Sequence, residues 1–309
     1  MITRKAPVLN IENLSKNYGR TRALRNINIV LDSPGVYGFL GPNGAGKTTT
    51  FKLICALLKP SRGRILIGGK DVQKDKKRAL SRVGVQFDSP AFYPYLTGSE
   101  NLRLITKWSR NTESTDIEKL LTFAGLRGTE SKKVKEYSWG MKQRLGLVSA
   151  LIGNPELLLL DEPTNGLDPA GIANVREFLP RLAHEEGRTL LLASHRMEEV
   201  EQVCDKIIII NKGIIVASGK PSELSCGKTI ELVLDDTDLA VKLLKKHFKG
   251  KGVITLSDNK IQLIEPGLET DDIKALLREN SIDLKKINKK RESLESVFLR
   301  LTKEDIYES

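Results

Sequence analysis

A short glycine-rich segment, Gly41 to Thr49, has the residue types and spacing that bind phosphate. It fits the pattern G-x-x-x-x-G-K-[ST], with Lys47 and Thr48 at the last two positions. Glycines let backbone N–H groups converge on an anion, and a following helix adds the positive end of its dipole. We expect Lys47 to bind the β- and γ-phosphates of a nucleotide and the Thr48 hydroxyl to bind Mg²⁺. The predicted contact residues are Gly41, Pro42, Asn43, Gly44, Ala45, Gly46, Lys47, Thr48 and Thr49.

Two acidic residues follow an apolar run further along the chain. Leu157 to Leu160 leads directly into Asp161 and Glu162. The end of a buried parallel strand lies at the sheet edge where ligands bind in such folds. We expect Asp161 to hold Mg²⁺ through water and Glu162 to activate the attacking water as general base. Alone, the segment is equally compatible with an acidic turn. Together with the loop at Gly41, it indicates a nucleoside-triphosphate hydrolase.

The loop requires a strand before it and a helix after it, and the sequence supplies both. Val36 to Leu40 is apolar and β-rich, and residues 48–58 have apolar positions at helical spacing. Apolar runs of strand length at 157–160, 190–193 and 207–210 predict strands that are buried on both faces, which is typical of a parallel sheet covered by helices. Shorter strands are predicted at 8–13, 27–31, 65–67 and 83–86.

Residues 99–151 are predicted to be mainly helical, with Ser99, Thr115 and Ser138 as candidate N-caps. From about Ser222 the pattern changes to the order βαββαβ and a closing helix, which matches the ferredoxin-like arrangement. Its strands are predicted at 229–234, 252–256, 260–264 and 283–288, and its helices at 239–248, 270–280 and 294–303. We therefore predict a nucleotide-binding domain at 1–222, with a helical subdomain at about 88–152, and an accessory α+β domain at 223–309.

The loop and the acidic pair do not identify the nucleotide, and further motifs narrow the choice. A GTPase would need the string N-K-x-D, and the nearest one, from Asn211, lacks the aspartate. The segment Tyr137-Ser-Trp-Gly-Met-Lys-Gln-Arg144 resembles the signature motif of ABC ATPases, usually written LSGGQ, and precedes the Asp161 strand as that family requires. Tyr18 resembles the family's adenine-stacking aromatic, Gln86 its Q-loop glutamine, Asp168 the end of its D-loop, and His195 its switch histidine.

The resemblance covers residues 6–222 and implies the family's fold and chemistry. The fold is an α/β P-loop NTPase with a RecA-like core, an antiparallel β subdomain and a helical subdomain. The cofactors are ATP and Mg²⁺. Glu162, His195 and Gln86 are the implied catalytic residues, and Thr48, Gln86 and Asp161 the implied metal site. Ser138, Trp139, Gly140 and Met141 are expected to bind the ATP of a partner chain, which implies a head-to-tail dimer with a second copy or a paralogous ATPase chain.

Two positions of the signature depart from the common pattern. Trp139 replaces a small glycine and Met141 replaces the final glutamine. The string Ser-x-Gly-Met-Lys-Gln-Arg is similar to a drug-resistance and antibiotic-immunity branch, which includes bacitracin- and lantibiotic-type exporters and sodium exporters. The tail at Ser293–Thr302 resembles the C-terminal extension of that branch. The branch resemblance favours export of a peptide antibiotic, a drug or a lipid-like molecule.

Composition limits where such a protein acts. No apolar run approaches the roughly 20 residues that span a membrane, so separate permease subunits are expected. Cys55, Cys204 and Cys226 form no CxxC pair and are expected to be reduced thiols, as in the cytosol. We expect a cytoplasmic protein, peripheral on the inner face of the cell membrane. The alternatives are a soluble ABC ATPase that acts on ribosomes or DNA, and a non-hydrolysing regulator, against which Glu162 and His195 argue.

The net charge is +11, and the excess lies before residue 225, notably between Arg62 and Arg82. A solvated surface and a patch that faces anionic lipid or nucleic acid are both compatible with this run. No aromatic residues interleave its charges, so no nucleic-acid partner is expected.

Overall fold

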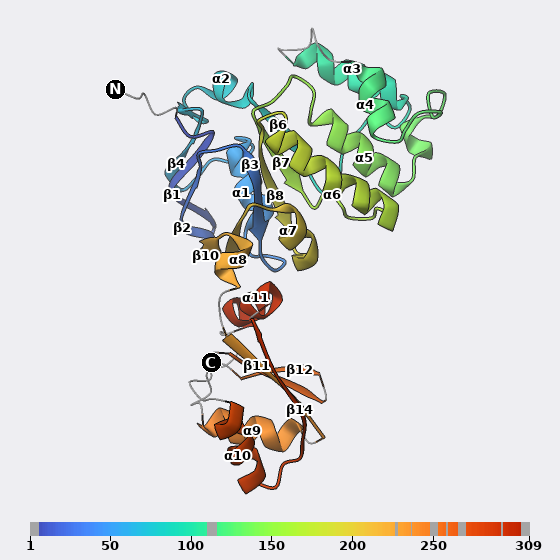
Figure 1. Ribbon diagram of the computed structural model, residues 1–309. Helices are drawn as coiled ribbons and strands as arrows, with labels where there is room; N and C mark the ends of the chain where they lie inside the picture. Colours follow the sequence, from blue (N-terminus) through green and yellow to red (C-terminus); the bar gives the residue numbers. More distant parts are fainter. Residues whose placement is uncertain are drawn as a thin grey trace. The chain divides into compact units, whose positions relative to one another are not determined.

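The chain divides into two compact units, Met1–Ser218 and Gly219–Ser309. The computed structural model describes residues 6–109, 116–225, 228–235, 237–247, 253–257, 259–264, 270–291 and 293–303 (Figure 1). Each unit has its own buried core.

The first unit is built on a six-stranded sheet with the order β10-β9-β3-β8-β7-β6. Every residue of β3, β7 and β8 is buried, as predicted from their continuous apolar runs. The pairs β9–β3, β3–β8, β8–β7 and β7–β6 are parallel, so the carboxyl ends of these strands meet at one edge. The strands are β3 (Gly35–Leu40), β6 (Val83–Gln86), β7 (Leu157–Asp161), β8 (Thr189–Ser194), β9 (Lys206–Asn211) and β10 (Ile214–Gly219).

Helices cover both faces of this sheet. The helices α6 (Pro169–His184) and α7 (Met197–Val203) contact β3 and β8. On the other face, α1 (Lys47–Ile54) lies between the parallel sheet and a second sheet, and buries Phe51 in a core shared with both. The helix α1 ends before the predicted Leu58, because the backbone turns to a positive φ of 51° at Ala56.

The second sheet of this unit is antiparallel, with the order β2-β1-β4-β5. Its strands are β1 (Leu9–Tyr18), β2 (Thr21–Leu31), β4 (Arg62–Ile67) and β5 (Lys70–Asp71), and the short helix α2 (Lys76–Leu80) follows β5. This sheet and the six-stranded sheet confirm the predicted α/β core with an antiparallel β subdomain.

Three helices form a subdomain with its own apolar cluster around Leu102, Leu121 and Leu145. Figure 1 shows them on the side of the six-stranded sheet opposite to β1, β2 and β4. They are α3 (Gly98–Trp108), α4 (Ile117–Phe123) and α5 (Trp139–Ser149), with a 3₁₀ turn, η1 (Val134–Glu136), before α5.

The N-caps of these helices differ in part from the prediction. Ser138 caps α5 as predicted, since its Oγ accepts a hydrogen bond from Met141 N at 3.2 Å. The Ser99 prediction is wrong: Thr97 caps α3, because Glu100 at the third helical position completes a capping box with it. Asp116 caps α4, and the predicted cap Thr115 lies outside the described residues.

After the short helix α8 (Pro221–Leu224), the second unit has the order βαββαβ and a closing helix. Its sheet has the order β12-β13-β11-β14, and each neighbouring pair is antiparallel. This is the element order of the ferredoxin-like arrangement. The helices α9 and α10 pack on this sheet, α9 against β12 and β13 and α10 against β14, and their residues Ala240, Leu244, Ile273 and Leu277 belong to its buried core. The elements are α8 (Pro221–Leu224), β11 (Lys228–Leu234), α9 (Thr237–His247), β12 (Val253–Ser257), β13 (Lys260–Ile264), α10 (Thr270–Glu279), β14 (Leu284–Arg291) and α11 (Leu294–Lys303).

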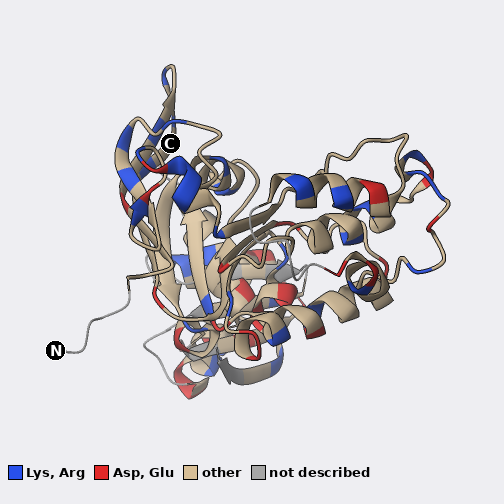
Figure 2. Cartoon of the chain, turned by 90° about the horizontal axis from the view of Figure 1, so that it is seen from above, with Lys and Arg blue, Asp and Glu red and all other residues tan. Residues whose placement is uncertain are grey.

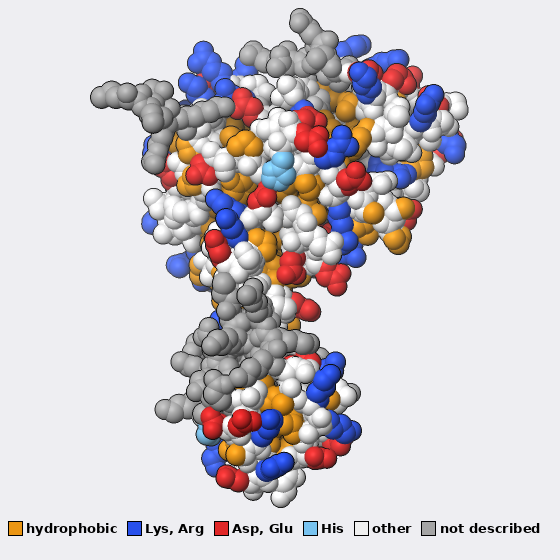
Figure 3. Space-filling model, viewed as in Figure 1, with side chains coloured by type: hydrophobic (Ala, Val, Ile, Leu, Met, Phe, Trp, Pro, Cys, Tyr) orange, Lys and Arg blue, Asp and Glu red, His pale blue; other side chains and the backbone are white. Residues whose placement is uncertain are grey.

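The surface carries mixed charge. Figure 2 shows basic and acidic residues interspersed along the helices, and Figure 3 shows hydrophobic side chains in small groups between them on the visible face. Within the basic run, Arg64 pairs with Glu12 at 2.6 Å and Arg82 with Glu156 at 3.4 Å. Glu12 and Glu156 are distant from the run in sequence. They therefore neutralise part of its positive charge, which its local composition does not show.

Two further sequence expectations concern membrane spans and thiols. Among the described residues, none of the helices combines the length and apolarity that a membrane span requires. Cys55 and Cys204 are buried free thiols, and burial raises the pKa of Cys55 to about 12. Cys226 lies outside the described residues.

The separate core of the second unit gives a stability prediction. Leu232, in the central strand β11, is fully buried. Leu232→Ala should destabilise the second unit by about 2–5 kcal/mol and leave nucleotide affinity unchanged. The matched control is Leu239→Ala on α9, where the side chain is half exposed and the expected loss is within about 0.5 kcal/mol. Calorimetry and a nucleotide titration of each variant measure both quantities; equal losses for the two leucines would contradict the assignment of this core.

Candidate functional site

The glycine-rich loop joins β3 to α1 and needs its glycines for space. A methyl group added at Gly41 would lie 2.4 Å from Ile210 O, and one at Gly46 would lie 2.6 Å from Leu24 Cδ2. Gly46 also has a φ of 115°, a backbone conformation that favours glycine. The loop borders a pocket of about 250 Å³, lined by Ala23, Pro42, Asn43, Gly44, Gly46, Lys47, Thr48, Thr49, Asp88, Asp161 and Glu162.

Lys47 is the cation of this pocket. Its side chain is only 7% exposed, and its Nζ donates to Gly41 O at 2.6 Å and to Pro42 O at 3.3 Å. Burial lowers the pKa of Lys47, and the nearby carboxylates of Glu162 and Asp161 oppose that shift. The ammonium group is therefore held inside the loop by neutral carbonyl acceptors, which a phosphate oxygen would replace with a stronger, charged one.

Thr48 and Asp161 meet across the pocket, although 113 positions separate them in sequence. The Thr48 hydroxyl donates to Asp161 Oδ2 at 3.0 Å. Burial raises the pKa of Asp161; the Thr48 hydrogen bond and Lys47 lower it, and the charges of Glu162 and Asp88 raise it further. A carboxylate and a hydroxyl are oxygen donors that suit Mg²⁺, and a cation here would offset the crowding of negative charge. The residues present thus fit the predicted metal.

Glu162 and His195 also meet, because the parallel strands β7 and β8 end side by side. Glu162 has a φ of 51° and donates its backbone N–H to Ala193 O at 2.9 Å. Its Oε1 lies 2.9 Å from His195 Nδ1. The carboxylate borders the pocket while the imidazole is about half exposed. This geometry suits a general base that is oriented by a histidine.

Gln86, the predicted Q-loop glutamine, contacts α5 and does not line the pocket in this structure. Its buried side chain donates from Nε2 to Gln143 of α5, to the backbone O at 3.1 Å and to Oε1 at 2.6 Å. Its own Oε1 is buried without a hydrogen-bond partner. Gln86 is not part of the pocket lining, so in this structure it ties β6 to the start of α5.

Asp88 is a pocket residue that the sequence reasoning missed. Its Oδ1 accepts from Asn165 Nδ2 at 2.9 Å, and its backbone O accepts from Gln143 Nε2 at 2.5 Å. Its position in the sequence could have identified it, because Asp88 comes shortly after the end of β6, just as Asp161 lies at the end of β7. Carboxylates at that edge of a parallel sheet are candidates for ligand binding. Asp88 therefore connects the pocket with both α5 and the segment after β7.

The remaining predicted residues lie outside the pocket lining. Tyr18 ends β1, is 46% exposed, and has Lys16 Nζ at 5.1 Å from its ring centroid. Ser138 to Met141 begin α5. Asp168 caps α6, because its Oδ1 accepts from Gly171 N at 3.0 Å. A single chain thus brings together the loop, Asp161, Glu162 and His195, but not the signature segment.

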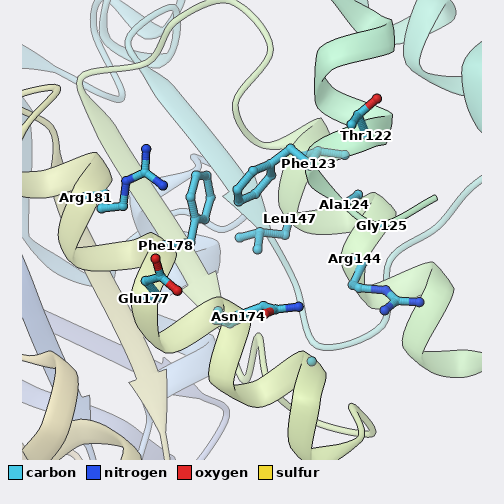
Figure 4. A pocket seen from close by; sticks show the side chains of 13 residues that line it. Thr122, Phe123, Ala124, Gly125, Arg144, Leu147, Asn174, Glu177, Phe178 and Arg181 are labelled. Carbon is cyan, nitrogen blue, oxygen red and sulfur yellow. The ribbon is translucent and has the colours of Figure 1, made fainter. Parts of the chain in front are cut away.

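A larger cavity, of about 350 Å³, lies between α4, α5 and α6 (Figure 4). The rings of Phe123 and Phe178 meet at one side of it, with centroids 3.7 Å apart. It is lined by none of the predicted site residues, so the smaller pocket at the loop is the candidate site.

Comparison with known proteins agrees with this geometry. Residues 24–165 match the protein family described as ABC transporter. Over 296 residues the chain is 36% identical to the bacitracin transport ATP-binding protein BcrA of Enterococcus faecalis, and the match covers 95% of this chain and 96% of BcrA. The chain belongs to the ABC transporter ATP-binding proteins. The resemblance predicted from the motifs is therefore confirmed.

Two further similar proteins match a shorter part of the chain than BcrA does. The lantibiotic transport ATP-binding protein SrtF of Streptococcus pyogenes is 40% identical over 209 residues, which is 68% of this chain and 89% of SrtF. The dimeric ABC transporter cassette MJ0796 superposes with a TM-score of 0.63 at 25% identity, over 69% of this chain and 98% of that one. Each of these matches is slightly shorter than the first unit, whereas the BcrA match spans both units.

The buried carboxylate gives a pH-dependent prediction. Because the pKa of folded Asp161 is raised, its charged form destabilises the nucleotide-free fold above that pKa. Asp161→Asn keeps an oxygen that accepts from Thr48 and should raise the unfolding temperature at pH 7 without nucleotide or metal. The gain should shrink as the pH falls through the raised folded pKa and vanish below about 3.9, the pKa of an aspartate in the unfolded chain, because the carboxyl group is then protonated in both states.

Thermal unfolding of both proteins across this pH range, with EDTA present, measures the difference. Asp168→Asn is the control, because Asp168 is exposed and asparagine also caps helices. A lower unfolding temperature for Asp161→Asn at pH 7 would show that the carboxylate stabilises the free protein.

Proposed function

We propose that this chain hydrolyses ATP to drive a separate membrane permease that exports an antibiotic-like compound. The observation that carries the hydrolytic part is the contact between Glu162 and His195 at the edge of the phosphate-loop pocket. The cargo class is supported by the similarity to BcrA along almost the whole chain and by that to SrtF.

The pocket residues divide the work by their chemistry. The backbone N–H groups of the loop and Lys47 would bind the phosphates, and Thr48 and Asp161 would hold Mg²⁺. When bound, Mg²⁺-ATP supplies the phosphoryl group that water attacks. Glu162 accepts the proton of that water at Oε1 or Oε2, and His195 orients the carboxylate. Gln86, with its unpartnered Oε1, is the proposed sensor of the metal.

The signature segment supports a two-chain site. Ser138 and Gly140 lie at the N-terminus of the eleven-residue helix α5, where N–H groups and the helix dipole favour an anion. They lie outside the pocket of their own chain, so the anion they suit belongs to a second chain. We infer a head-to-tail dimer with another copy or a paralogous ATPase chain, closed on two nucleotides at the cytoplasmic face of the membrane and docked to permease subunits.

Removing the loop cation tests nucleotide binding. Lys47→Ala should weaken ATP binding by about 100-fold, because a buried charge-assisted contact to phosphate is lost. Lys52→Ala is the matched control on the exposed face of α1. Calorimetric titration with ATP measures both affinities. Equal affinity of Lys47→Ala and the unchanged protein would contradict the role of this lysine.

Neutralising the proposed base separates binding from hydrolysis. Glu162→Gln should bind ATP and remain as a closed dimer, with hydrolysis reduced by about 10²–10⁴-fold. Phosphate release and sedimentation with ATP measure the two effects. Hydrolysis at the unchanged rate would show that Glu162 is not the base.

The cargo class needs a cellular test. Deleting the coding sequence from its source organism should increase susceptibility to bacitracin or to a lantibiotic. The unchanged gene should restore resistance and the Glu162→Gln gene should not. Susceptibility that stays the same for both compounds would reject this cargo class and leave the ATPase assignment standing.

A further inference from the structure

Trp139, the bulky residue of the signature segment, lies against the predicted D-loop of its own chain, Asn165–Asp168. A methyl group added at Gly166 would lie 2.1 Å from Trp139 Cδ1 and 2.6 Å from Nε1, so the indole occupies the space that a side chain at 166 would need. The residue after Trp139 also lies close to Gly166, because a methyl group added at Gly140 would lie 3.3 Å from Gly166 O. Trp139 remains 45% exposed, so it contacts the D-loop and still faces solvent.

The D-loop residue before Gly166 is connected to the catalytic pocket. The backbone N–H of Asn165 donates to Glu162 O at 3.0 Å, and its side chain donates to Asp88 at 2.9 Å. Both acceptors belong to residues that line the phosphate-loop pocket. A displacement of Gly166 must therefore act on a segment that is hydrogen-bonded to the proposed base and to its acidic neighbour.

The segment is also anchored at Thr164, which lies between Glu162 and Asn165, so it does not move as one body with such a displacement. Thr164 donates its hydroxyl to the buried Glu199 of α7 at 2.5 Å. The backbone N–H of Leu167 donates to Thr164 O at 3.1 Å, which closes a tight turn around Gly166. Asn165 lies between this fixed residue and Gly166, so a displacement of the turn acts on the hydrogen bonds of Asn165 to Glu162 and Asp88.

We propose that Trp139 is a positioning residue that couples the nucleotide bound at the signature segment to the base of its own chain's pocket. The inference rests on the proposed two-chain site. Engagement of a partner's nucleotide by Ser138 and Gly140 shifts the start of α5, and the rigid indole transfers that shift to Gly166 and Asn165. A small residue at 139 would leave a gap, and α5 would move without the D-loop.

A double-mutant cycle on the nucleotide-free protein tests the contact itself. Gly166→Ala adds a methyl group where Trp139 lies, and it also strains a backbone with a φ of 72°. The strain is the same in any background, whereas the clash requires the indole. Gly166→Ala should therefore lower the unfolding temperature more in the unchanged protein than in Trp139→Ala. Additive effects would show that the two residues do not interact and would overturn the proposal.

A kinetic split tests the coupling. Trp139→Ala should lower kcat by about 10- to 100-fold, because the base is misplaced. The ATP concentration that gives half the maximal rate should not change, because the nucleotide is still held. Trp139→Phe should retain most of the rate, since a ring still fills the space. Trp108→Ala is the control, because Trp108 is 88% exposed at the end of α3. Weaker ATP saturation with kcat unchanged would mean that Trp139 only binds nucleotide, which overturns the proposal.

Fluorescence supplies a readout that does not depend on turnover. The chain has two tryptophans, so Trp108→Phe leaves Trp139 as the sole indole. In the Glu162→Gln background its emission should shift when ATP closes the dimer, and no shift in a dimer that has closed would overturn the inference. Failure of Glu162→Gln to dimerise with ATP is a different result, which would reject the proposed two-chain site itself.

Discussion

The parallel pairing of β6, β7, β8 and β3 is the constraint on which the rest of the first unit depends. Because these strands run in the same direction, the residues that follow them reach a single sheet edge from distant parts of the sequence. The hydroxyl of Thr48 meets Asp161, and Glu162 meets His195, at hydrogen-bond distance there. Strands buried on both faces keep this edge rigid, and the loops beyond it carry the chemistry.

The same sheet edge buries charged groups whose burial does not stabilise the nucleotide-free protein. Asp161 and Lys47 are almost fully buried, and burial shifts their pKa values in opposite directions, each toward the uncharged form. Neutral carbonyls hold the lysine, and one hydroxyl contacts the aspartate. The site is therefore preorganised for a phosphate and a cation, at a cost in stability to the nucleotide-free state.

The sequence predicted the parts of the structure whose signal is local. Continuous apolar runs identified β3, β7, β8 and β9, and glycine spacing identified the phosphate loop. The prediction missed β10, whose alternately exposed residues lack such a run, and Thr97, although the capping box Thr97-x-x-Glu100 was readable. Contacts such as Gln86 with Gln143 and Trp139 with Gly166 depend on tertiary packing, which no spacing along the chain encodes.

The helix α5 is attached to the six-stranded sheet near both of its ends. Near its start, Gln143 holds Gln86 at the end of β6. Just past its other end, Ala150 O approaches so closely that a methyl group at Gly84 of β6 would lie 1.8 Å away. These two contacts resist a shift of α5 along β6, whereas a rotation about the line that joins them would preserve both. Because α3 and α4 pack on α5, such a rotation would carry them with it, and the helices furthest from the line would move most.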